Sequence, residues 1–288
     1  QIHATADIEI TGSENSTPAM ALLANVHRGD VNFADYFYPH LLMGQDLVDY
    51  LKAAIIEGEV EQAQVLFNGP LANFPFHDNS GIFVVDAELI KSKFQFDPSW
   101  PVINDFSANL NFTNNSMLIT GRGGSLSGID VTGVEVAIDD LDNQQILTVD
   151  ANFKDTLPEA VSNLMDNSPM ESTVGETLNQ LRVSNNISGS FALNLPLNDL
   201  DSVVASGKVN FNNNQVALQT PAMNFTEVNG ELSFKNDVIN TRDLALNWRK
   251  MPMELVVKAN DTENDYYQTL INLQAKWPEL TWKKELPQ

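Results

Sequence analysis

Apolar side chains recur at every second position over many segments of this chain. The alternation is most regular over residues 147–153, 191–197 and 271–277. Shorter stretches of the same period are residues 8–10, 83–89, 134–138 and 244–248. Because successive side chains of a β-strand point to opposite faces, this pattern predicts strands with one apolar face and one solvated face.

Three segments repeat the order apolar strand, Asn-rich turn, apolar strand. The turns are Asn114-Asn115, residues 212–214 and Asn236-Asp237, and Asn makes up about one residue in nine of the chain. Asn and Asp tolerate the left-handed backbone conformation that tight hairpin turns require. We therefore predict three hairpins, each of which has an apolar face that it cannot cover by itself.

Helical periodicity is restricted to three short segments. Residues 44–57 carry one apolar stripe and are followed by Gly58, a residue type common just after a helix end. Residues 155–166 have Pro158 in their first turn, and residues 171–182 show apolar spacings of three and four. We predict a helix in each segment.

So few helices cannot cover the apolar faces of so many strands. We predict a mainly β chain: a long, strongly curved antiparallel sheet, forming a groove or half-barrel of repeated Asn-turn hairpins, with a few short helices including one near residues 44–57. No linker divides the chain, so residues 1–288 are expected to form a single elongated segment with a helical insert at residues 155–182. The apolar face must be covered by another sheet, by the curvature of the sheet itself, or by a ligand.

Charge and composition exclude several classes of function. The chain has 16 Lys and Arg against 38 Asp and Glu, a formal net charge of −22, and no Cys. An acidic surface opposes binding to nucleic-acid phosphates, and without Cys there are no disulfides, zinc–thiolate sites or cysteine nucleophiles. No stretch reaches the ~18 apolar residues of a membrane-spanning helix. Because the chain starts at Gln1 without a signal sequence, we expect a segment of a longer protein whose anchor lies outside it.

No motif assembles catalytic or metal-binding chemistry. The four His residues lack partners at metal-ligand spacing, and the Gly-rich stretch 121–128 fits a hairpin turn or bulge better than a phosphate-binding loop. The acidic clusters 139–143 and 261–265 are more typical of solvated turns than of calcium sites. The aromatic runs 74–76 and 100–101 suit structural anchors at strand ends better than a platform for sugar. We therefore expect no enzymatic activity and no cofactor or metal.

A series of motifs between Pro39 and Met117 is distinctive. In order, they are Leu41-Leu42-Met43-Gly44, Gly69-Pro70-Leu71, Phe74-Pro75-Phe76, Gly81-Ile82-Phe83 and Trp100-Pro101. Their order and spacing resemble the central periplasmic domain of the YhdP family, AsmA-like proteins of Gram-negative bacteria. The resemblance covers most of the chain and is most specific over residues 39–117, where His40 is a departure from the expected pattern.

The resemblance implies both a fold and a function. Proteins of this family are anchored in the inner membrane by a helix that this chain lacks, and they lie mostly in the periplasm. They are related to chorein-type bridge-like lipid transfer proteins, whose curved sheets form a groove with an apolar floor, and are implicated in moving phospholipid to the outer membrane and in its permeability barrier. The implied role is a non-enzymatic segment of a periplasm-spanning bridge, with phospholipid acyl chains, the inner membrane and outer-membrane components as partners.

A groove for acyl chains needs a continuous apolar lining, because burying each CH₂ group contributes roughly 0.8 kcal/mol. The residues predicted to line it are Leu110, Phe112, Met117, Val209, Phe211, Leu232, Phe234, Ile271 and Leu273. The alternative is that these residues form an ordinary core packed on helix 44–57. The protein would then be a scaffold for outer-membrane assembly or a carbohydrate-binding β-sandwich. A lining that is open at both ends favours the conduit, and a closed core favours the scaffold.

Overall fold

The structure is a computed structural model that describes most of the chain in two compact units. The described residues are 3–12, 17–32, 45–143, 145–169, 171, 175–199, 202–220, 222–236, 238–259 and 269–274. Unit 1 comprises residues 1–126, 130–150 and 194–203, and unit 2 comprises residues 127–129, 151–193 and 204–288. Each unit is described separately below.

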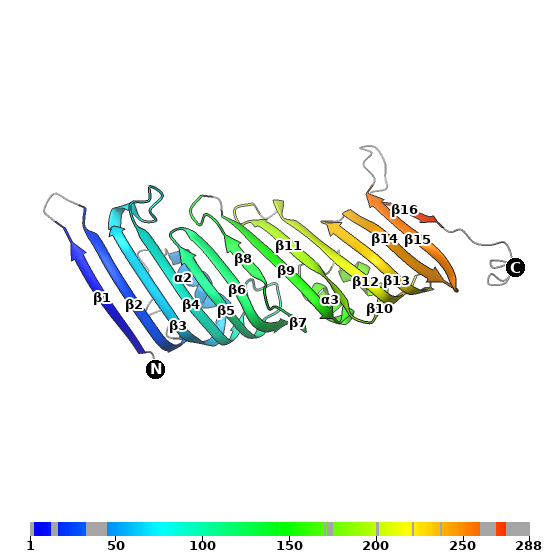
Figure 1. The fold of residues 1–288 in the computed structure, drawn as a ribbon, viewed down its shortest axis with the longest axis horizontal. Helices are drawn as coiled ribbons and strands as arrows, with labels where there is room; N and C mark the ends of the chain where they lie inside the picture. Colours follow the sequence, from blue (N-terminus) through cyan, green and yellow to red (C-terminus); the bar gives the residue numbers. More distant parts are fainter. Residues whose placement is uncertain are drawn as a thin grey trace. The chain divides into compact units, whose positions relative to one another are not determined.

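Unit 1 is an antiparallel sheet whose strands pair almost entirely in chain order (Figure 1). The strands are β1 (His3–Thr11), β2 (Ala19–Asp30), β3 (Ile55–Pro70), β4 (Ile82–Phe94), β5 (Ile103–Thr113), β6 (Ser116–Leu126), β8 (Glu135–Ile138) and the first part of β9 (Ile146–Thr156). The short β7 (Ile129–Asp130) pairs with β6.

Unit 2 repeats this arrangement with its own strands. They are the rest of β9, β10 (Leu181–Ser184), β11 (Ile187–Pro196), β12 (Val204–Leu218), β13 (Met223–Lys235), β14 (Val238–Trp248), β15 (Met251–Ala259) and β16 (Thr269–Gln274). The last residues of β11 belong to unit 1, and β10 pairs with β12. Among the described strands, β1 and β16 each pair with one neighbour, so the sheet is open. The prediction of a mainly β, antiparallel chain is confirmed.

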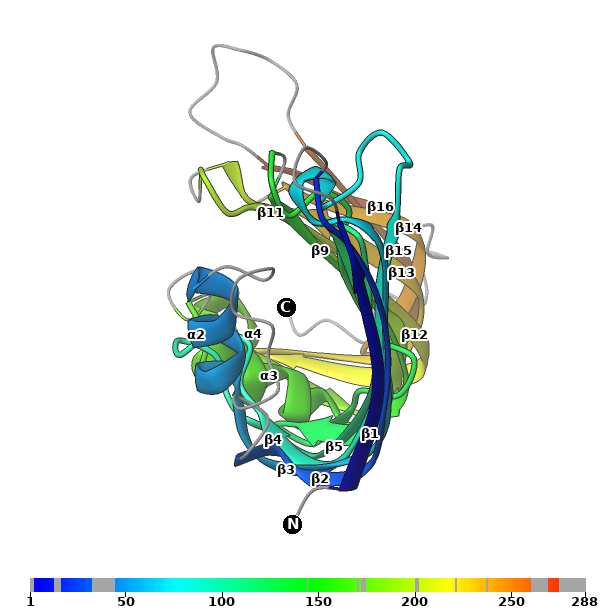
Figure 2. The same cartoon turned by 90° about the vertical axis from the view of Figure 1, so that its left-hand side faces the viewer.

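Helix α2 (Gln45–Ala54) occupies most of the first predicted helical segment. It lies on one side of β3, β4 and β5 (Figure 2) and buries Val48, Leu51 and Ala54. The prediction that this helix extends to residue 57 is wrong, because β3 begins at Ile55. The β-branched side chains that start β3 favour a strand, and Gly58 lies within that strand instead of following a helix.

The two later helices are shorter than predicted. Helix α3 (Pro158–Asp166) begins at the predicted proline and buries Ala160, Leu164 and Met165. Helix α4 (Glu176–Asn179) is a single turn, and β10 starts at Leu181, so the prediction of a helix through residue 182 is wrong at its end. Among the described residues, no helix is long and apolar enough to cross a membrane.

The Asn-rich segments take two different structures. Thr113 pairs with Ser116, so Asn114 and Asn115 form the two-residue connection between β5 and β6. In the same way Lys235 pairs with Val238 across the connection that contains Asn236.

The hairpin predicted at residues 212–214 is wrong, because β12 runs through this segment without turning back. Asn213 instead has φ of 57° at a register shift between β12 and β13, which is a β-bulge. Sequence pattern does not separate these cases, because a bulge and a tight turn both accept Asn with positive φ.

The bulge in β12 is held by a buried side chain, that of Asn214. Its Nδ2 donates to the carbonyl oxygens of Ser184, Asn185 and Asn186 at 3.0, 3.1 and 3.2 Å. Its Oδ1 accepts from the backbone N of Asn212 at 2.7 Å. One amide therefore ties β12 to the connection between β10 and β11.

Replacing Asn214 with Ala is expected to lower the free energy of unfolding of unit 2 by about 2–3 kcal/mol, because three backbone carbonyl groups lose their donor and the buried amide leaves a gap. Denaturant unfolding of the purified protein measures this change. Asn210→Ala, at an exposed position of the same strand, should change the value by less than about 0.5 kcal/mol. Equal effects of the two substitutions would contradict the assignment.

A line of bulges crosses four neighbouring strands of unit 1. Gly58, Lys91, Asp105 and Gly124 have φ of 149°, 50°, 50° and 130°, and each lies at a register shift of β3, β4, β5 or β6. The Oγ of the buried Ser92 donates to the carbonyl oxygen of Phe106 at 2.7 Å beside this line. A bulge bends the strand that carries it and increases its twist.

Gly58 is the member of this line that tolerates a side chain least. An added Cβ would lie 2.5 Å from Cβ of Ser92, so Gly58→Ala is expected to lower the free energy of unfolding of unit 1 by about 1–3 kcal/mol. Gly123→Ala is the matched control, because a Cβ there meets no atom within 4 Å. Chemical denaturation compares the two variants, and a tolerated Gly58→Ala would contradict the close approach.

Candidate functional site

One face of unit 1 carries two continuous rows of apolar side chains that run across the strands. Directly paired residues point to the same side of a sheet, so the pairing register defines each row. The first row is Ala24, Val65, Val85, Phe112, Met117, Ile138 and Leu147. The second row is Val26, Ala63, Ala87, Leu110, Ile119, Val136 and Val149. At about 4.8 Å per strand, each row is about 29 Å long.

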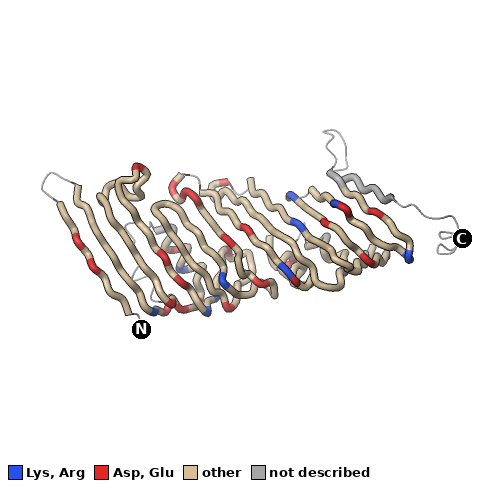
Figure 3. The backbone as a smooth tube through the Cα atoms, viewed as in Figure 1, with Lys and Arg blue, Asp and Glu red and all other residues tan. Residues whose placement is uncertain are grey.

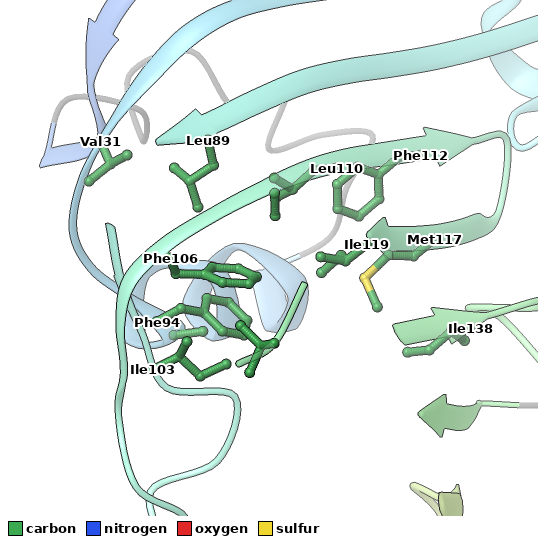
Figure 4. Close-up of a cluster of buried hydrophobic side chains, with 13 residues drawn as sticks. Val31, Leu89, Phe94, Ile103, Phe106, Leu110, Phe112, Met117, Ile119 and Ile138 are labelled. Atoms are coloured by element: carbon green, nitrogen blue, oxygen red, sulfur yellow. The ribbon is translucent and has the colours of Figure 1, made fainter. Parts of the chain in front are cut away.

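The middle of these rows is well packed. Leu110 and Phe112 are each 8% exposed, and Met117 and Ile119 are 3% and 4% exposed. Figure 4 shows these side chains and Ile138 projecting from neighbouring strands into the same space. Three of the predicted lining residues, Leu110, Phe112 and Met117, are thus brought together in one cluster.

Helix α2 meets this face near the bulge line. Ala54 is a buried member of the cluster and Tyr50 packs against it, and among the described members only these two belong to an α-helix. The rings of Phe94 and Phe106 stack beside them with centroids 5.4 Å apart (Figure 4). Burial raises the pKa of Tyr50, and the nearby charge of Asp97 adds to this. The helix therefore covers one end of the face and contributes little to its middle.

An aromatic cluster closes the other end of the same face. Phe67 and Phe83 follow the first row on β3 and β4, and they pack with Phe76, which is 1% exposed, and with the half-buried Phe74. Val85 packs against both this cluster and the main one, which places both on the same side of the sheet. The aromatic run 74–76 thus acts as a structural anchor at a strand end, one of the two predicted roles.

The opposite face of unit 1 is mostly polar. A row in register there consists of Asn25, Gln64, Asp86, Asn111, Leu118, Ala137 and Thr148. Glu88 also lies on this face, where a hydrogen bond from Gln62, with Arg122 as a second partner, lowers its pKa. Acidic positions outnumber basic ones along the chain (Figure 3). The sheet of unit 1 is therefore amphipathic.

The remaining polar groups do not assemble a chemical site. Hydrogen bonds from Ser80, Thr132 and the backbone N of Asn143 are the main causes of the lowered pKa of Asp78, Asp130 and Asp140, which lie in turns or, for Asp130, at the end of β7. Among the described residues, no group of three or more His, Asp or Glu could hold a metal ion. The Gly-rich stretch lies in β6 and the turn after it, and the acidic cluster 261–265 lies outside the described residues.

Unit 2 carries the other predicted lining residues in pairs on the three strands β12, β13 and β16. Val209 pairs with Leu232, and the ring of Phe234 lies over Gly207, where an added Cβ would be 2.5 Å from the ring. Phe211 packs against a buried cluster formed by Val228, Leu244, Leu246 and Met253. Ile271 and Leu273 pair with Val257 and Leu255 through the backbone.

Several residues of this surface are missing from the sequence-based prediction. Ala63 and Ala87 belong to the second row, where they lie on β3 and β4, and Val65 and Val85 hold the equivalent positions of the first row. The alternation over residues 83–89 was a usable signal for β4. In β2 and β3 the signal is blurred, because the opposite face carries the exposed Leu23 and Leu66.

An open antiparallel sheet with one apolar and one polar face defines a class of amphipathic β-sheet proteins. Within it, the chain belongs to the YhdP family, whose model, described as "YhdP protein", matches residues 1–287. It is 29% identical over 276 residues to the "Intermembrane phospholipid transporter YhdP" of Escherichia coli (strain K12). That alignment covers 96% of this chain and 22% of the relative, so the chain spans about a fifth of that protein's length. No solved structure matches the chain.

Proposed function

We propose that this chain is a non-enzymatic segment of a phospholipid carrier, and that its apolar rows bind acyl chains. The observation that carries the proposal is the continuity of the two rows across seven strands of unit 1. Rows that run across the strands offer an acyl chain an unbroken apolar path along the sheet. Their length of about 29 Å is close to the ~30 Å hydrocarbon thickness of a bilayer, in which two layers of acyl chains lie end to end.

The family supports the same substrate class. The Escherichia coli relative is named an intermembrane phospholipid transporter, and this chain aligns with part of it. We extend the proposal to a periplasmic segment of an inner-membrane-anchored bridge, with a sheet curved at its bulge lines into a groove. The polar face then keeps the bridge solvated, and headgroups remain in water at the open side of the groove.

In unit 2, the proposed lining comprises Val209, Phe211, Leu232 and Phe234; Ile271 and Leu273 on β16 are proposed from the sequence alone. The first four are half-buried, so they retain surface that an acyl chain can cover. Leu110 and Phe112 keep less surface than these four, and their common cluster with Ala54 is packing that a scaffold would also show.

Lipid analysis of the complete protein, purified from membranes without added lipid, separates the two candidates. The carrier is expected to retain phospholipid that mass spectrometry detects after solvent extraction, at a constant ratio to protein. A scaffold with a closed core would retain none. Absence of phospholipid from folded protein would therefore reject the carrier function.

A further inference from the structure

The segment 71–81, which connects β3 to β4, folds back over the apolar face of unit 1. Gly69 and Gly81 lie on that face, because they share the parity of Phe67 and Phe83. A Cβ added to Gly69 or Gly81 would lie 2.7 or 2.5 Å from the ring of Phe76. The ring of Phe76 therefore packs directly against the backbone of these two glycines, where no side chain would fit.

Phe76 in turn supports a second ring. The centroids of Phe74 and Phe76 are 5.9 Å apart at an interplanar angle of 87°, and Phe74 also lies edge-on to Phe83 at 5.5 Å. Edge-to-face contacts of this kind fix ring orientation as well as adding apolar contact. Phe76 is almost fully buried, whereas Phe74 keeps part of its surface exposed.

Hydrogen bonds hold the rest of the segment in place. The side chain of Asn73 donates to Asp78 at 3.2 Å and to Ser80 at 3.0 Å, and the backbone N of Phe76 donates to the carbonyl of Asn73 at 2.6 Å. His77 lies 3.2 Å from Asp142 in the connection between β8 and β9. The segment is thus fastened both within itself and to a second loop.

We propose that the segment 71–81 is an end wall of the lipid-binding face, in which Phe74 contacts acyl chains and Phe76 is the positioning residue behind it. The inference rests on the proposed function, because it assumes that the first row holds acyl chains. The aromatic cluster begins two residues beyond that row, at Phe67 on β3 and Phe83 on β4, about 7 Å away along these strands. The wall bounds the apolar path on one side, so acyl chains that cross β3 and β4 do not leave past the ends of these strands.

Photo-crosslinking in the complete protein, produced in cells whose phospholipids carry radioactive phosphate, tests the wall. A photoreactive phenylalanine analogue is placed singly at Phe74, at Phe112, or at the outward-facing Leu66. Labelled phospholipid is expected at positions 74 and 112 and not at 66. Capture at 112 without capture at 74 would overturn the wall and leave the carrier function standing. Capture at neither apolar position would reject the carrier function and the wall together.

The role of Phe76 has a separate readout. Phe76→Ala is expected to reduce capture at position 74 roughly tenfold, because the ring that orients Phe74 is lost, while capture at position 112 stays unchanged. Phe76→Leu, which keeps apolar volume on the two glycines, should restore part of the capture at 74. A parallel fall at both positions in Phe76→Ala would assign Phe76 to folding alone and overturn its positioning role.

Discussion

Replacing Phe67 with Ala is expected to lower the free energy of unfolding of unit 1 by about 3–5 kcal/mol. Its side chain is fully buried and its ring lies 5.2 Å from that of Phe76, with Phe74 and Phe83 each at 6.2 Å. Truncation leaves a cavity among the three remaining rings, those of Phe74, Phe76 and Phe83. Neighbouring strands cannot close it without disturbing the paired backbone on both sides.

The matched control for this variant is Leu66→Ala. Leu66 is the preceding residue on β3, points to the opposite face and is 37% exposed, so the expected loss is below about 1 kcal/mol. Denaturant unfolding curves of the purified proteins measure both effects. Losses of similar size at the two positions would show that the aromatic cluster does not hold this end of the sheet.

Replacing Leu110 with Lys is expected to reduce bound phospholipid roughly tenfold or more, because a charge in an apolar path must be desolvated wherever an acyl chain passes. Leu110 occupies the middle of the second row, between Ala87 and Ile119. The same substitution also costs stability, since Leu110 is 8% exposed. Circular dichroism therefore accompanies the lipid analysis, and the uncharged Leu110→Gln provides a milder comparison.

Asn111→Lys is the control that adds the same charge to the polar face of the same strand. Asn111 is the next residue on β5 and belongs to the polar row, so its variant should keep phospholipid at the original ratio. The lipid content of the two variants is measured after identical purification. Equal lipid loss in both, or full retention in a folded Leu110→Lys, would contradict the assignment of the second row.

Sequence predicted strands where the two faces differ clearly. β4 and β9 follow from alternation, because one parity is apolar in each. The connection at Asn114 and Asn115 follows from turn chemistry. The failure in β12 has the same chemical origin: Asn213 adopts positive φ, but Asn214 binds three carbonyl groups of another connection. The connection between β10 and β11, about thirty residues away in sequence, stabilises the bulge instead of a turn. A local sequence pattern does not include this partner.

The candidate surface was harder to predict than the strands. Leu110, Phe112 and Met117 were found because they flank a recognisable turn. Residues such as Ala63 and Ala87 enter the rows only through strand register, which depends on how several bulges shift the pairing. Register is set by the whole face that is buried, so a single-strand pattern does not reveal it. Helix α2 ends before its predicted end because β3 begins at Ile55, and the pairing of β3 with β4 is not visible in the helical pattern of this segment.

The central claim is that one face of the sheet carries acyl chains and the other does not. The most direct measurement is a photo-crosslinking scan of every position along β5 from Ala108 to Thr113, in the complete protein within cells. We predict phospholipid capture at Ala108, Leu110 and Phe112, and none at the three positions between and after them. Capture without this alternation, or capture confined to the polar positions, would contradict the account.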